Sequence, residues 1–118
     1  MKENIKTDLH VVVFLEGESF VAQCLEYDIN AAYNNGEGQL SELLERFTRA
    51  FIGEIVLCHE HNDPILIKIK PAPEYYWKKF EFSLKLKEKI FVKTSEWFPK
   101  SKKIKEIPSD FRFQIGIV

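Results

Sequence analysis

Apolar and polar positions in the first third of the chain follow the pattern of short β-strands. Leu9–Leu15 is a β-branched run that is apolar on both faces, which is typical of an inner strand covered on two sides. The turn Glu16–Ser19 separates this run from a second predicted strand, Phe20–Leu25, and Ile29–Tyr33 follows as a third. We therefore expect these segments to form an antiparallel three-stranded meander.

A period of three to four residues replaces the strand pattern between Gln39 and Leu57. One stripe of this segment is wholly apolar and consists of Leu40, Leu43, Leu44, Phe47, Phe51 and Ile55. Glu42 and Glu45 fall outside the stripe in the first turns, where a carboxylate suits the positive end of a helix dipole. The pattern predicts an amphipathic helix that packs on the strands.

Two further strands and a second helix are predicted downstream. Ile65–Ile69 favours a fourth strand, and residues 111–118 alternate as in a half-buried strand. Pro73 at a first helical position, followed by Glu74, predicts a second helix. A strand at the end of the chain needs an edge, either of its own sheet or of a twin subunit.

Two stretches leave alternatives open or lack a regular pattern. Residues 82–93 fit either a continued helix or a strand, because Phe80, Phe82, Leu84 and Leu86 alternate with polar residues. Residues 94–110 are broken by two prolines and are predicted to be irregular.

The predicted elements indicate an α+β fold in one domain, since 118 residues suffice for a single core. We place a core in residues 1–73 and a C-terminal extension, packed as part of the same domain, in residues 74–118. Pro71 and Pro73 form the clearest joint between them. No apolar run reaches the ~18 residues of a membrane span, and the start lacks the apolar region of a signal peptide, so we expect a cytoplasmic protein.

Charge divides the chain into an acidic and a basic part, although its net charge is only −1. Residues 1–60 hold four Lys or Arg against eleven Asp or Glu, which gives −7. Residues 78–105 hold ten Lys against three Glu, which gives +7. Such polarity indicates separate partners for the two parts or attraction between them within the fold.

Two motifs carry a resemblance to a known family. V-A-Q-C-L-E-Y-D-I (Val21–Ile29) closes the second predicted strand, and L-x-E-x-L-E-R-F (Leu40–Phe47) opens the helix. Together with I-K-I-K-P-A-P-E (Ile67–Glu74), they resemble the HicB-like proteins over about residues 9–73. The resemblance does not include the C-terminal DNA-binding domain that antitoxin members usually carry.

The resemblance implies a degenerate ribonuclease H-like core without metal-binding carboxylates, and a role in protein binding. HicB antitoxins mask a small basic HicA ribonuclease. By that analogy we expect a homodimer that binds a basic protein, such as a HicA-like toxin. The predicted partner-binding residues are Glu26, Tyr27, Asp28, Glu42 and Glu45. Their carboxylates would speed the encounter, and Tyr27 would anchor the contact.

The Lys-rich region supports an alternative function, a nucleic-acid-binding accessory protein. Lysines neutralise phosphates, and the neighbouring aromatic side chains could stack on bases. The candidate residues are Lys78, Lys79, Lys85, Lys87, Lys102 and Lys103. The competing interpretation is that the aromatic residues belong to the core and the lysines form a solvated face.

Catalysis has weaker support than binding. A two-metal nuclease needs converging carboxylates, and Asp8 and Glu16 stand at opposite ends of the first predicted strand. Glu26, Asp28 and Glu42 are the remaining candidates. Cys58, His59 and His61 would give a zinc site three ligands without a fourth at ordinary spacing. We therefore predict a protein that is not an enzyme and needs no metal or cofactor.

Overall fold

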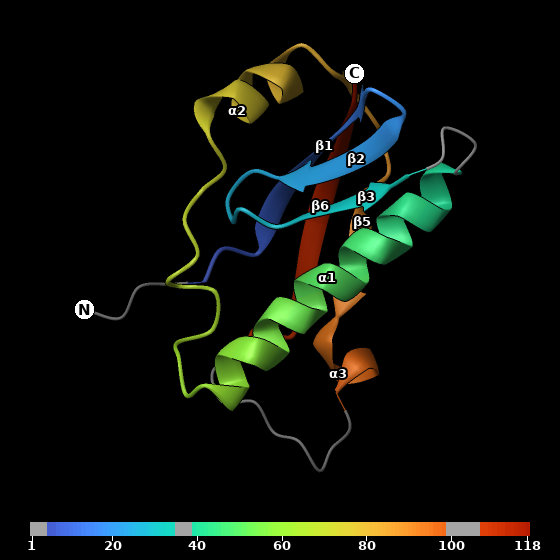
Figure 1. The fold of residues 1–118 in the computed structure, drawn as a ribbon. Helices are drawn as coiled ribbons and strands as arrows, with labels where there is room; N and C mark the ends of the chain where they lie inside the picture. The colour runs from blue at the N-terminus through green and yellow to red at the C-terminus, as the bar shows by residue number, and fades with distance from the viewer. Residues whose placement is uncertain (1–4, 35–38, 99–106) are drawn as a thin grey trace.

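The computed structural model describes residues 5–34, 39–98 and 107–118, which form six strands and three helices (Figure 1). In chain order the elements are β1 (Asp8–Glu16), β2 (Ser19–Cys24), β3 (Asn30–Tyr33), α1 (Leu40–Glu60), α2 (Glu74–Glu81), β4 (Leu84–Lys85), β5 (Ile90–Lys93), α3 (Thr94–Trp97) and β6 (Asp110–Ile117). The predicted α+β class is confirmed. Among the described residues, no helix is both long and apolar enough to cross a membrane.

The strands form one mixed sheet in the order β3-β2-β1-β6-β4, with β5 also paired to β6. β1 pairs with β2 and β2 with β3 in antiparallel fashion, whereas β6 runs parallel to β1. The terminal strand was predicted to need an edge, either of its own sheet or of a twin subunit, and it pairs with β1 of its own sheet. β4 and β5 pair with its other side, so β6 lies inside the sheet, and its Phe111, Phe113 and Ile115 are buried in the core.

Helix α1 covers one face of the sheet and supplies five of the 18 buried residues in the main core cluster. Its buried residues are Leu43, Phe47, Phe51, Ile52 and Ile55. The Phe51 ring lies edge-on to two β6 rings, with centroids 4.9 Å from Phe111 and 5.0 Å from Phe113. Edge-to-face pairs at this distance add to the stability gained by burial. The predicted apolar stripe therefore faces the sheet, with Leu40 and Leu44 half-buried at its margin.

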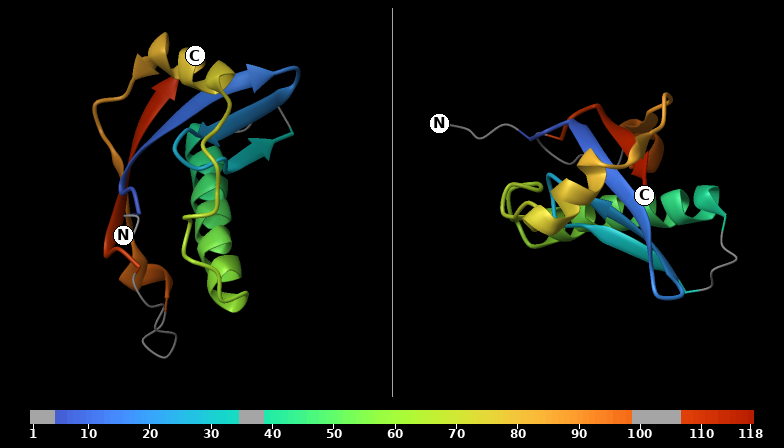
Figure 2. Two further views of the ribbon diagram at one scale, coloured as in Figure 1. Left: turned by 90° about the vertical axis from the view of Figure 1, so that its left-hand side faces the viewer. Right: turned by 90° about the horizontal axis from the view of Figure 1, so that it is seen from above.

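Helix α2 packs on the opposite face and covers only one end of it (Figure 2). Tyr76 and Phe80 lie against a small cluster of Val12, Phe14 and Leu25. The predicted helix start is confirmed, with Pro73 as the capping residue and Glu74 as the first helical one. The helix ends at Glu81. Residues 82–93, for which the sequence fitted either helix or strand, contain two short strands rather than a continued helix.

The predicted strand Ile65–Ile69 is wrong, because this segment forms turns. Leu66 adopts a left-handed conformation with φ 61°, and the Ile69 amide donates to the Leu66 carbonyl over 3.1 Å. Ile65 and Leu66 are nevertheless buried in the main core. Since β6 already occupies the position beside β1, the segment has no partner strand there and closes the end of the core as a turn.

The C-terminal region is part of the core rather than an extension of it. β6 supplies three of the buried residues that α1 packs against, so residues 1–73 do not contain the complete core. Residues 94–110, predicted to be irregular, include α3 and the first residue of β6. Residues 99–106 of this stretch, with Lys102 and Lys103, lie outside the described residues.

Candidate binding surfaces

Two of the predicted partner-binding residues are buried. Glu26 is 7% exposed and Tyr27 is 6% exposed, so neither side chain is presented to a partner. The exposure that direct contact with a partner requires is therefore not found for either residue. Asp28 is exposed, but its carboxylate accepts a hydrogen bond from Gln23 Nε2 over 2.9 Å.

Glu26 is buried because it satisfies two polar groups of His10. Its Oε1 accepts the His10 backbone N–H over 2.8 Å, and its Oε2 lies 2.6 Å from His10 Nδ1. A buried carboxylate is stable only when it is hydrogen-bonded or paired, and these two hydrogen bonds meet that condition. The His10 ring also stands edge-on to Phe80 of α2, with centroids 5.2 Å apart. Glu26 therefore ties the end of β2 to β1 under α2.

Tyr27 and Asp28 complete the same hydrogen-bonded bend between β2 and β3. The Tyr27 hydroxyl accepts the Lys6 backbone N–H over 2.8 Å, and burial of the ring raises the pKa of that hydroxyl. The Asp28 backbone N–H donates to the Lys70 carbonyl over 2.7 Å. The end of the motif that carries the family resemblance is thus held by hydrogen bonds to other segments of the chain. Asp28 is its exposed carboxylate.

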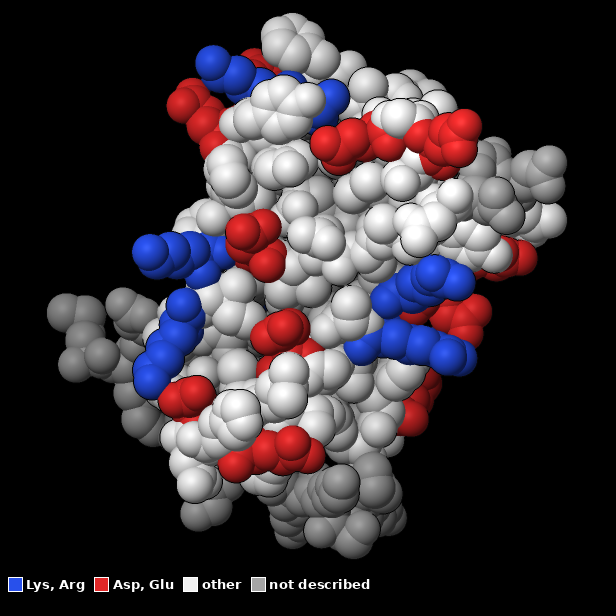
Figure 3. All heavy atoms as spheres, in the orientation of Figure 1, with Lys and Arg blue, Asp and Glu red and all other residues white. Residues whose placement is uncertain are grey.

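The other two predicted residues, Glu42 and Glu45, are exposed on the outer side of α1. A hydrogen bond to the Glu42 carboxylate raises the pKa of the Tyr33 hydroxyl on β3. Glu45 Oε1 pairs with Arg49 Nη2 over 2.8 Å, one helical turn away. Basic groups stand beside acidic ones where α1 runs in the space-filling view (Figure 3). The two carboxylates are accessible, and a cation one turn away accompanies Glu45.

The described lysines of the alternative site gather on α2 and β4. Lys78, Lys85 and Lys87 are exposed, and Lys79 is half-buried. Lys79 Nζ lies 4.9 Å from the ring centroids of both Phe14 and Tyr75. Lys85 Nζ donates to the Glu81 and Ser83 carbonyls over 2.6 Å and 3.0 Å.

Several aromatic side chains in this region are exposed, contrary to the interpretation that the aromatic residues belong to the core. Phe82 is 85% exposed, and Tyr75 and Phe91 are each 61% exposed. Trp77 and Trp97 are more than a third exposed. Sequence periodicity places Tyr75 and Phe82 on one helical stripe, but it does not reveal which side of the helix meets the sheet.

The described residues contain no group of three or more His, Cys, Asp or Glu side chains that could hold a metal ion. The candidate carboxylates Asp8, Glu16, Glu26, Asp28 and Glu42 therefore do not converge. Cys24 is buried, and burial raises the pKa of its thiol to about 12. A thiol in that state is not a nucleophile at neutral pH.

Comparisons with protein-family models, with curated proteins and with solved structures give no match to this chain. The resemblance to HicB-like proteins therefore stays a prediction that depends on the sequence motifs.

Proposed function

We propose that this chain is a non-enzymatic, HicB-like domain that binds a basic protein through its acidic N-terminal half. Three antiparallel strands followed by a helix are the arrangement that the resemblance implies, and β1, β2, β3 and α1 have this order and pairing. The fourth strand of such a core would be β6, which lies beside β1.

The observation that carries the proposal is the charge of the exposed side chains. Among described residues up to Glu60, seven exposed carboxylates stand against three exposed Lys or Arg, a balance of −4. Among the described residues from Ile65 onward, seven exposed Lys stand against four exposed Glu, a balance of +3. The charge asymmetry of the sequence is therefore a property of the surface, where it can steer a charged partner.

Within the acidic half, the proposed contact residues are Asp28, Glu42 and Glu45. Glu26 and Tyr27 do not contact the partner in this proposal, but they stabilise the bend on which Asp28 is exposed. The half-exposed ring of Tyr33, beneath the Arg46 guanidinium at 4.4 Å, would supply an aromatic contact beside Glu42. A small basic protein such as a HicA-like toxin fits this chemistry.

A homodimer remains part of the proposal, but β6 does not supply its interface. β6 has β1 on one side and β4 and β5 on the other. A twin subunit would have to use another surface, such as the outer edge of β3, which pairs only with β2 among the described strands.

Charge reversal of Glu42 and Glu45 tests the proposed contact. We expect the double variant Glu42→Lys/Glu45→Lys to lose capture of a short basic protein encoded by a neighbouring reading frame when the two are co-expressed. Both residues are exposed, so thermal stability should change by no more than about 0.5 kcal/mol. Glu88→Lys/Glu96→Lys, in the basic half, is the matched control and should retain capture.

Undiminished capture by the Glu42→Lys/Glu45→Lys variant would reject this surface. A captured partner with net negative charge would reject the electrostatic basis of the proposal as a whole.

A further inference from the structure

Helix α2 carries a second stripe of side chains, apart from Tyr76 and Phe80, which pack on the sheet. Tyr75, Lys78, Lys79 and Phe82 follow each other at intervals of three, one and three residues, which places them along one side of a helix. We call these four residues the outer stripe. Phe82 is the C-capping residue, and its amide still donates to the Lys78 carbonyl, so the helical spacing extends to it.

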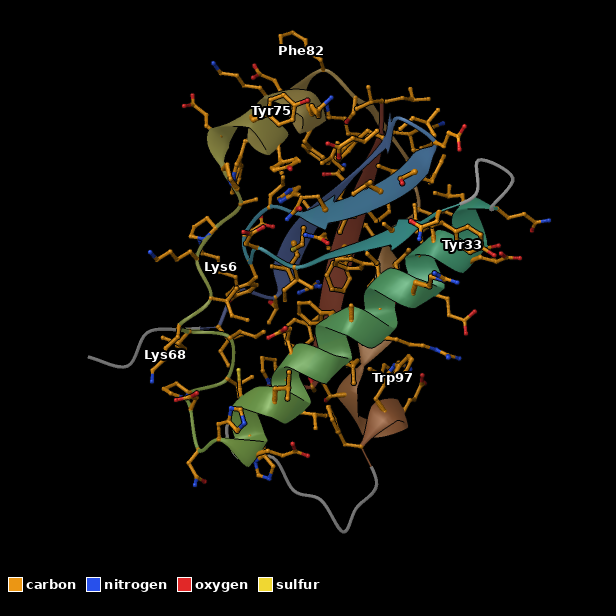
Figure 4. All side chains as sticks on the ribbon, in the orientation of Figure 1. Lys6, Tyr33, Lys68, Tyr75, Phe82 and Trp97 are labelled. Atoms are coloured by element: carbon orange, nitrogen blue, oxygen red, sulfur yellow. The ribbon has the colours of Figure 1, made fainter. Side chains whose placement is uncertain are left out.

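The ends of the outer stripe are exposed aromatic rings. Tyr75 is 61% exposed and Phe82 is 85% exposed, and both lie at the surface of α2 (Figure 4). Seven residues separate them, or about 10 Å along the helix axis at 1.5 Å per residue. Large aromatic side chains that remain in water at neighbouring positions mark a binding site more often than a structural need.

Positive charge lies between the two rings. Lys79 Nζ is 4.9 Å from the Tyr75 centroid, and Lys78 Nζ is 3.8 Å from Glu74 Oε1. Lys85 adds a third ammonium group near the C-terminal end of α2, held by hydrogen bonds to the Glu81 and Ser83 carbonyls. The surface therefore combines cations with flat apolar faces along a line.

This combination selects one class of ligand. A polymer that offers regularly spaced anions and accessible π-faces is a single-stranded nucleic acid, whose bases stack on aromatic side chains while lysines meet its phosphates. A duplex hides the faces of its bases in the stack, and an acidic peptide offers charge without those faces. The rise of about 10 Å between the two positions is comparable with about three base steps at 3.4 Å per step.

We propose that the outer stripe, together with Lys85, binds single-stranded nucleic acid without sequence preference. Bases would stack on Tyr75 and Phe82, and phosphates would lie against the three lysines. This surface belongs to the basic half of the molecule, so the proposal goes beyond the protein-binding function. Each can fail without the other, because their contact residues are different.

Fluorescence anisotropy with labelled oligonucleotides of about 20 nucleotides, longer than a typical single-domain site, tests the proposal. With three phosphates neutralised, the affinity for a single strand should fall about 20-fold between 50 and 200 mM salt. A duplex of the same length should bind more weakly at each salt concentration.

Two variants separate stacking from charge. Phe82→Ala should weaken single-strand binding about 10-fold through the loss of one stacked base. Lys78→Gln/Lys79→Gln leaves one of the three lysines, so the salt effect over the same range should shrink to about threefold. Phe91→Ala, at another ring that is 61% exposed, is the matched control and should leave the affinity unchanged.

Three outcomes would overturn the proposal. The first is no anisotropy change at low salt with protein at about 100 μM, the weak end of non-specific binding. The second is an equal loss in Phe82→Ala and Phe91→Ala. The third is tighter binding to anionic phospholipid vesicles than to the oligonucleotide, which would assign the stripe to a membrane surface. Circular dichroism of each variant confirms that it is folded.

Discussion

Helices α1 and α2 pack on opposite faces of one sheet, yet they use their apolar residues in opposite ways. α1 buries five large side chains, and its Phe51 is fully buried. α2 has no buried residue, and Phe82 at its end is 85% exposed. The comparison teaches that the aromatic content of a segment does not measure its share of the core. The aromatic residues of α1 stabilise the fold, whereas those of the outer stripe of α2 are available for binding.

The largest expected effect is that of Phe51→Ala on α1. The Phe51 ring packs between Phe111 and Phe113, so truncation leaves a cavity at the centre of the core. We expect a loss of about 3–5 kcal/mol in the free energy of unfolding, measured by urea denaturation. A loss below about 1 kcal/mol would contradict the placement of α1 and β6 against each other.

A smaller effect is expected where α2 approaches the sheet most closely. A Cβ at Gly116 of β6 would clash with Ser83 Oγ and lie 2.9 Å from the Phe80 ring. Gly116→Ala should therefore cost about 1–3 kcal/mol through overpacking. Gly53→Ala is the control, because a Cβ there meets nothing within 4 Å and alanine favours the helix. Equal stabilities of the two variants would show that α2 does not rest on β6.

A still smaller effect is expected at the buried carboxylate beneath α2. In Glu26→Gln the charged acceptor is lost, and the amide keeps both contacts only as weaker neutral hydrogen bonds, with His10 Nδ1 as the acceptor of one of them. The expected cost is about 1–2 kcal/mol in the same urea measurement. Asp28→Asn, at the exposed neighbour, retains an acceptor for Gln23 and should be near neutral. A Glu26→Gln variant as stable as the parent would contradict the burial of the Glu26 side chain.

Much of the first half of the fold could be predicted from sequence because its patterns are periodic and local. The stripe from Leu43 to Ile55 faces the core as the period of three to four residues predicts. The strands before it were likewise found by composition and turn residues. The position of β6 was not predictable in this way, since pairing between Val11 and Ile115 joins segments about a hundred residues apart.

The position of Glu26 beside His10 has a signal in the sequence. The two-residue turn Gly17–Glu18 pairs Glu16 with Ser19, and counting back along the strands brings His10 opposite Leu25. A carboxylate beside that pair is within reach of the His10 ring. Sequence alone does not show that α2 then covers the site, because this depends on which side of α2 meets the sheet.

The exposure of the outer stripe could also not be predicted from the sequence. Tyr75, Tyr76, Trp77 and Phe80 are all large and aromatic, so hydrophobicity does not distinguish the inner from the outer side of α2. The small cluster of Val12, Phe14 and Leu25 decides it by accepting Tyr76 and Phe80. Tyr75 is left 61% exposed, and Trp77 is 37% exposed.

The contrast between the two helices is tested most directly by urea unfolding of the double variant Tyr75→Ala/Phe82→Ala. Two aromatic side chains are removed, yet we expect the free energy of unfolding to stay within about 0.5 kcal/mol of the parent value, because both rings are largely in water. A loss approaching that of Phe51→Ala would contradict this account, since the rings would then belong to the core and not to a binding surface.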